Sequence, residues 1–78
     1  MKIKYDSEGW TIVDADGNNH HVPPHGLLVM YGATLMGAAM GHTQTSVTDG
    51  LLVPHSHIMG LCAEMEQART LFENKDIN

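Results

Sequence analysis

The sequence predicts a small α+β domain, and three observations carry that prediction. The first 22 residues alternate between strand-like segments and turn clusters. A long apolar segment without charged side chains follows them, and the last third of the chain has the periodicity of an amphipathic helix. Because the chain has only 78 residues, we expect a single domain spanning residues 1–78.

The N-terminal segment is expected to form a small antiparallel meander. Lys2–Tyr5 and Trp10–Val13 are rich in β-branched and aromatic residues, and Asn19–Val22 is a candidate third strand. Turn clusters at Asp6–Gly9 and Asp16–Asn18 separate these segments, because Asp, Asn and Gly favour tight turns.

A helix is predicted from His25 to about Gly41. Pro23 and Pro24 precede it, and proline suits the first turn of a helix. Four glycines weaken the prediction, since each costs about 1 kcal/mol relative to alanine in a helix. The alternative is a buried strand at Leu27–Tyr31 followed by a shorter helix.

A short hairpin or an extended link is expected next. Asp49-Gly50 lies between Ser46–Thr48 and Leu51–Val53, and Asp-Gly between two apolar or β-branched segments is a hairpin signal. Pro54 ends this region.

The C-terminal segment is predicted to be an amphipathic helix from about Ser56 to Asn74, with Ser56 as its N-cap. Apolar residues recur there at steps of three and four, with polar residues between them. The apolar positions are Ile58, Leu61, Cys62, Met65, Ala68 and Phe72.

Composition argues against several functional classes. Four basic and nine acidic residues give a net charge of −5, which is unsuited to direct nucleic-acid binding because phosphate neutralisation dominates that affinity. The charge-free segment Gly26–Gly41 is shorter than the roughly 20 residues of a membrane-spanning helix. Cys62 is the single cysteine, and the N-terminus has no secretory pattern, so we expect a cytoplasmic protein.

No charged residue occurs between Gly17 and Thr48, a stretch of 32 residues. A helix that is apolar all round is a buried helix. One amphipathic helix and three short strands cannot cover all of its sides, so we expect a protein partner, most simply a second copy. The alternative left open is that this helix is the internal core of one chain.

Two sets of residues are candidates for contacts with a partner. The first lies on the apolar helix, where small residues allow close approach and methionines adapt to a binding surface; it comprises Met30, Ala33, Met36, Gly37, Met40 and Gly41. The second set is Glu64 and Glu66, which would meet a basic surface.

Histidines supply a metal-binding alternative. His55 and His57 share one face of an extended segment, and His20 and His25 flank the two prolines. Imidazole binds zinc and other transition metals, but no established Cys/His metal motif is present. No cofactor is therefore expected outside this alternative.

The functional prediction is a non-enzymatic protein-binding module that acts as a homo-oligomer or by docking on a larger protein. No phosphate-binding glycine motif or catalytic pair of side chains is present. By compositional analogy alone, the chain is similar in style to small acidic inhibitors or adaptors from phages and mobile elements, for example anti-CRISPR proteins. A His-rich metal-binding protein and a short membrane-associated protein are the alternatives.

Overall fold

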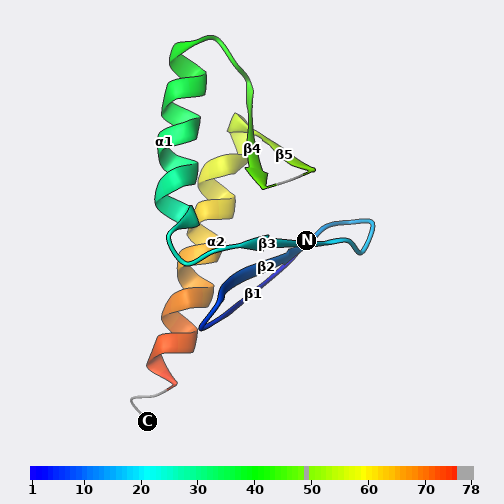
Figure 1. The fold of residues 1–78 in the computed structure, drawn as a ribbon, viewed down its shortest axis with the longest axis vertical. Coiled ribbons are helices and arrows are strands. Elements are labelled where there is room, and N and C mark those ends of the chain that lie inside the picture. Colours follow the sequence, from blue (N-terminus) through cyan, green and yellow to red (C-terminus); the bar gives the residue numbers. More distant parts are fainter. Residues whose placement is uncertain (49, 76–78) are drawn as a thin grey trace.

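The computed structural model describes residues 1–48 and 50–75 and shows the predicted α+β class (Figure 1). Its elements, in chain order, are β1 (Lys2–Asp6), β2 (Gly9–Val13), β3 (Asn19–Val22), α1 (Gly26–Ala39), β4 (Gln44–Thr48), β5 (Leu51–Pro54) and α2 (His55–Asn74). The radius of gyration is 12.9 Å, against about 11.5 Å for a compact domain of this length. The molecule is therefore elongated.

The N-terminal meander is confirmed. Strands β1, β2 and β3 form one antiparallel sheet in that order. The register places Ile3 opposite Ile12 and Trp10 opposite Val22. Because side chains alternate along a strand, Trp10, Ile12 and Val22 point to one face, where all three are buried.

Helix α2 packs against this sheet, and Trp10 is the centre of the contact. The Trp10 side chain is fully buried, and its Nε1 donates a hydrogen bond of 2.7 Å to the carbonyl oxygen of Met65. Tyr5 packs edge-on against both Trp10 and Phe72, with ring centroids 4.9 and 5.4 Å away. The Arg69 guanidinium lies 5.7 Å from the centre of the Trp10 ring, within cation–π range.

The amphipathic stripe of α2 is confirmed, since Ile58, Leu61, Cys62 and Met65 are buried. The prediction that Ser56 caps this helix is wrong. The helix begins one residue earlier, with Pro54 at the N-cap position and no side-chain cap hydrogen bond. The backbone N–H of His55 instead donates to the carbonyl oxygen of Thr43, 2.9 Å away, so the preceding loop satisfies it.

The segment between the two helices was expected to be a short hairpin or an extended link, and the structure shows the hairpin. Strands β4 and β5 pair antiparallel, with Thr45 opposite Val53 and Ser46 opposite Leu52. Asp49 of the predicted turn lies outside the described residues. The hairpin is a sheet of its own, separate from the N-terminal meander.

Helix α1 runs antiparallel to α2 (Figure 1), so the alternative of a strand at Leu27–Tyr31 is wrong. The helix ends at Ala39, two residues before the predicted end, in a two-bond C-terminal cap. Gly41 has φ +85°, and its N–H donates to Ala38, while the N–H of His42 donates to Gly37. Glycine suits this position because it adopts the left-handed conformation without a Cβ penalty.

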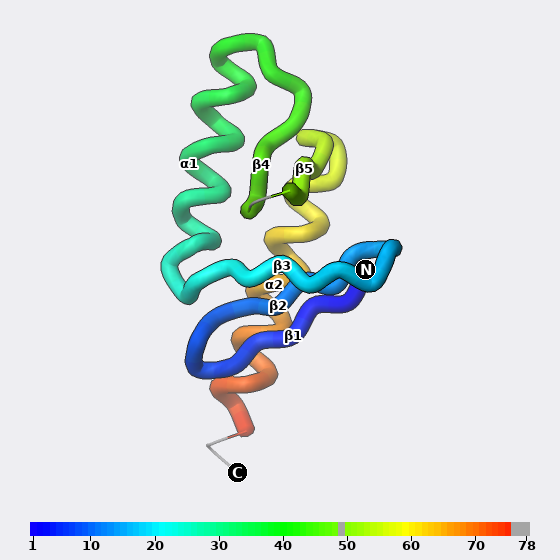
Figure 2. Tube along the Cα trace, turned by 45° about the vertical axis from the view of Figure 1, so that its right-hand side comes forward, coloured from blue at the N-terminus to red at the C-terminus, as the bar shows by residue number. Residues whose placement is uncertain are grey.

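The expectation that α1 is buried holds for its first turns alone. Only Gly26, Leu27 and Met30 are buried along this helix. Figure 2 shows α1 at the edge of the molecule, with β4 and α2 on one side of it. The alternative that α1 is the internal core of a single chain is therefore wrong, because two short sheets and one helix cover too little of its surface.

Candidate protein-binding surface

The most exposed apolar surface lies on the side of α1 that faces away from the rest of the chain. We call this surface the outer α1 face and define it by seven exposed residues: Leu28, Val29, Gly32, Ala33, Leu35, Met36 and Met40. The five large side chains are between 61% and 77% exposed. Apolar surfaces of this kind on soluble proteins often correspond to interaction sites.

The spacing of these residues explains why they form one surface. Val29, Ala33, Met36 and Met40 follow one another at steps of four, three and four, and the row Leu28, Gly32 and Leu35 repeats the first two of these steps. Residues at this spacing stay on one side of a helix, so the two rows lie side by side.

The few polar side chains of α1 point inward, toward the chain itself. Thr34 Oγ1 is 3.2 Å from Thr45 Oγ1 on β4, and Thr45 Oγ1 is 2.8 Å from Nε2 of His55 on α2. Tyr31 donates a long hydrogen bond of 3.4 Å to Glu66. Helix α1 thus turns Leu27, Met30 and its polar side chains toward the chain and leaves its other large apolar side chains exposed, whereas an ordinary surface helix has a polar outer face.

Three of the six predicted contact residues on α1 lie on the outer α1 face: Ala33, Met36 and Met40. Met30 is 2% exposed and belongs to the core, so its assignment to an exposed surface is wrong. Gly37 faces His42 and His55, because a Cβ placed there would contact both side chains. Gly41 lies beyond the helix and forms its cap, so the three small residues do not make one strip.

The predicted acidic pair is exposed but does not form one patch. Glu64 and Glu66 are two residues apart on α2, which turns their side chains about 160° from each other around the helix. Glu66 faces Tyr31 on α1, whereas Glu64 faces the opposite side. The fold therefore does not place Glu64 and Glu66 on a single acidic surface.

The four predicted metal ligands are not brought together. His20 Nε2 lies 2.8 Å from Asp14 Oδ2, and His55 is bonded to Thr45. His25 precedes α1, while His55 contacts the helix near Gly37, about 18 Å further along its axis. Among the residues that the structure describes, no three His, Cys, Asp or Glu side chains lie close enough to hold a metal ion.

Asp14 and Cys62 are titratable groups whose surroundings shift their pKa values. The hydrogen bond from His20, followed by the backbone N–H of Asn18, lowers the pKa of Asp14. Burial raises the pKa of the Cys62 thiol, and the neighbouring Tyr31 hydroxyl opposes that effect. A raised pKa disfavours the thiolate, which is the nucleophilic form of cysteine. The absence of enzymatic activity stays a prediction.

Sequence reasoning missed part of this surface. Leu28, Val29 and Leu35 were not among the predicted contact residues. The rows to which they belong, with steps of four and three residues, could be read from the sequence. The hydrogen-bonded set of Thr34, Thr45 and His55 was missed as well. These residues are ten or eleven positions apart, in a helix, a strand and a second helix, and no local pattern links them.

No protein-family model, curated protein or solved structure matches the chain. Within residues 1–48 and 50–75, no helix combines the length and the apolar character needed to cross a membrane. The geometry of the outer α1 face is therefore the basis for assigning a function.

Proposed function

We propose that the protein is a protein-binding module that associates with a second copy of itself through the outer α1 face. The observation that supports this proposal is the exposure of five large apolar side chains on a helix whose polar groups point inward. Placing that face against water is unfavourable, and a partner with a similar face would remove both surfaces from water.

The size of the face suggests a weak or moderate dimer. Burying a Leu, Val or Met side chain contributes about 1.5–3 kcal/mol, which corresponds to about 60–120 Å² of apolar surface. Five such side chains would bury roughly 300–600 Å² on each chain, against about 800 Å² per partner in a standard interface. We therefore expect dissociation in the micromolar range.

The distribution of side-chain sizes suits a second copy. Gly32 and Ala33 lie near the middle of the helix, with Leu28 and Val29 before them and Leu35 and Met36 after them. In an antiparallel pair, the small residues would meet at the crossing point and the large ones would pack on each side of it. Such a contact is self-complementary, as two-fold interfaces require.

Charge also favours an apolar protein partner over a lipid surface. The outer α1 face has no Lys or Arg, and the chain carries a net charge of −5. Helices that bind anionic membranes combine an apolar face with basic residues.

The proposal is tested by analytical ultracentrifugation of the unmodified chain and two variants. Leu35→Glu introduces a charge into the outer α1 face of both copies, and we expect dimer affinity to fall at least about a hundredfold. Leu52→Glu is the matched control, because Leu52 is also exposed but lies on the opposite side of the hairpin from Thr45, which contacts α1. A chain that stays monomeric at several hundred micromolar would contradict the proposal.

The predicted role as an inhibitor or adaptor, and the link to mobile elements, rest on composition and stay predictions. The proposal places the protein in the cytoplasm, because Cys62 is the single cysteine and no internal disulfide can form.

A further inference from the structure

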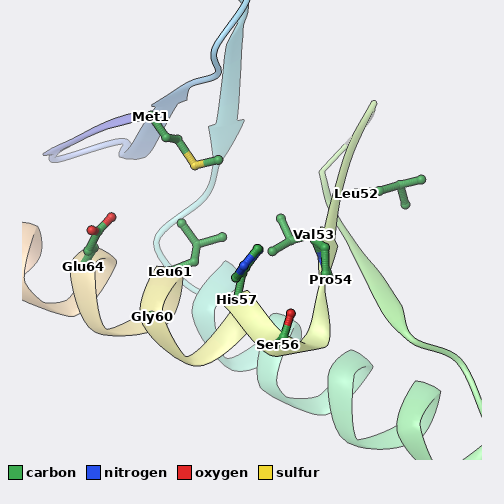
Figure 3. Close-up of a pocket in the computed structure, with 9 residues that line it drawn as sticks. All are labelled: Met1, Leu52, Val53, Pro54, Ser56, His57, Gly60, Leu61 and Glu64. Carbon is green, nitrogen blue, oxygen red and sulfur yellow. The ribbon is translucent and has the colours of Figure 1, made fainter.

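Two adjoining hollows lie along α2. The first has a volume of about 420 Å³ and is lined by Met1, Leu52, Val53, Pro54, Ser56, His57, Gly60, Leu61 and Glu64 (Figure 3). The second has a volume of about 400 Å³ and is lined by Met1, Ile3, Glu64, Gln67, Ala68 and Leu71. Because Met1 and Glu64 line both, we describe the two hollows together as the α2 groove.

The α2 groove is long and open. Its floor runs along α2 from Ser56 to Leu71, about 22 Å at 1.5 Å per residue. An extended peptide of about seven residues spans the same distance. A compact small ligand would fill one hollow at most, so the shape favours a chain segment.

The walls of the α2 groove come from separate parts of the fold. In Figure 3, Met1 at the start of the meander reaches over one side, and Val53 and Pro54 of the hairpin form the other. Leu61 rises from the floor between them, while the side chain of Leu52 points away. The groove thus lies where the two sheets leave α2 uncovered.

The α2 groove and the outer α1 face are on different sides of the molecule. Cys62 and Glu66 are the α2 residues beside Tyr31 of α1. At 100° per residue, Gly60, Glu64 and Leu71 lie about 160–180° around the helix from Cys62. A second copy bound to α1 would therefore leave the groove open.

The charge of the α2 groove indicates the chemistry of its occupant. Glu64, shared by both hollows, is the one Asp, Glu, Lys or Arg among the lining residues. Met1, which also lines both hollows, carries the N-terminal ammonium, but this group forms no ion pair with Glu64. The ion pairs in the described part of the chain are His20–Asp14 and Arg69–Glu73, so Glu64 has no cationic partner there. A Lys or Arg flanked by apolar side chains would complement a carboxylate between hollows whose walls include apolar side chains, Val53 and Leu61 in the first and Ile3 and Leu71 in the second.

We propose that the α2 groove binds an extended segment of another protein, with apolar side chains in the two hollows and a Lys or Arg paired with Glu64. The sites on α1 and α2 act independently, so this proposal stands whether or not the chain forms a dimer.

The test is selection of a phage-displayed random heptapeptide library on the immobilised full chain. We expect enriched sequences to carry a Lys or Arg flanked by apolar residues, and a synthetic copy of one to bind in solution. Glu64→Lys should weaken that binding about tenfold or more. Glu73→Lys makes the same charge change on an exposed turn of α2 outside the groove and should leave the affinity within about twofold.

Each other outcome would overturn the proposal. These outcomes are no enrichment, enrichment of acidic peptides, equal weakening by both charge reversals, and loss of peptide binding in Leu35→Glu, which would move the site to α1. Methyl NMR provides a second readout that does not depend on a variant. The peptide should shift the signals of Met1, Leu61 and Leu71 and leave those of Leu28 and Leu35 unchanged.

Discussion

The two halves of the molecule expose apolar residues to different extents. In the half formed by the meander and α2, they point inward around Trp10, and the exposed positions are mostly polar. In the half formed by α1 and the hairpin, Leu27, Met30, Leu51 and Val53 join the same core. Thr34 and Thr45 also lie inside this half, and five large apolar residues of α1 face outward. The two halves share one core, but the second half also has an extended apolar surface on α1 that the chain itself leaves uncovered.

The largest loss of stability should come from a substitution in the half formed by the meander and α2. Trp10→Ala removes a fully buried side chain and leaves the carbonyl oxygen of Met65 without its donor. Such changes cost about 3–5 kcal/mol, close to the whole stability of a domain of this size. We expect the variant to be unfolded by circular dichroism at 25 °C.

Trp10→Phe separates packing from hydrogen bonding, since it keeps an aromatic ring and loses the donor. It should stay folded, with a lower midpoint in urea. If Trp10→Ala unfolds at nearly the wild-type urea concentration, the meander and α2 are not the stabilising half.

A smaller effect is expected where the second half is joined to the first. Thr45 is 5% exposed and bonded to both Thr34 and His55. Thr45→Val preserves the shape but leaves two polar groups without their partner, at a cost of about 1–3 kcal/mol. We expect the substitution to accelerate amide hydrogen exchange in α1 more than in α2, relative to the unmodified chain. Thr43→Val, at an exposed position, is the control, and uniform acceleration in both helices would contradict this account.

The end of α1 provides a local test. Gly41→Ala places a Cβ at φ +85°, which costs about 1–2 kcal/mol for an L-residue. The expected result is a lower urea midpoint and fraying of the last turn of α1, visible as loss of amide protection at His42. Gly60→Ala, within α2 and with open space around its Cα, should instead raise stability by about 0.5–1 kcal/mol. Equal effects from the two variants would argue against the cap.

The smallest effect concerns the turn at Asp14. Its carboxylate accepts hydrogen bonds from His20 and from the backbone of Asp16 and Asn18. Because the folded-state pKa is below the unfolded value of 3.8, the stabilisation is present above that pH and is lost as pH falls through the folded value.

The measurement is the difference in urea midpoint between the unmodified chain and Asp14→Asn from pH 7 to pH 2.5. The difference should shrink at the acid end. Asp16→Asn, at an exposed position in the same turn, serves as the charge-matched control. A difference that does not change with pH would show that the carboxylate charge contributes nothing.

Local patterns in the sequence predicted most of the fold. The three strands, the hairpin and both helices were readable from alternation, turn residues and the period of 3.6, and the end of α2 was predicted correctly at Asn74. The errors were at helix ends. Ser56 has the right chemistry for an N-cap, but the backbone of Thr43 supplies the bond at the helix start, and that contact depends on the tertiary structure.

The candidate site was only partly predictable. The absence of charge between Gly17 and Thr48 indicated a surface that needs cover, and Met36 and Met40 lie on it. Which side of α1 faces outward could not be predicted, because its residues are apolar on all sides and its orientation depends on tertiary contacts, the packing of Leu27 and Met30 in the core and the contact of Thr34 with Thr45. The α2 groove depends on where two separate sheets end, which no local pattern records.

The position of Trp10 has a consequence for how the protein can be observed. Trp10 is the single tryptophan of the chain, and its indole N–H is bonded to the backbone of α2. Tryptophan fluorescence will therefore report chiefly the contact between the meander and α2. A fluorescence melting curve and a far-ultraviolet ellipticity curve should diverge for this chain, and their separation would measure the independence of α1.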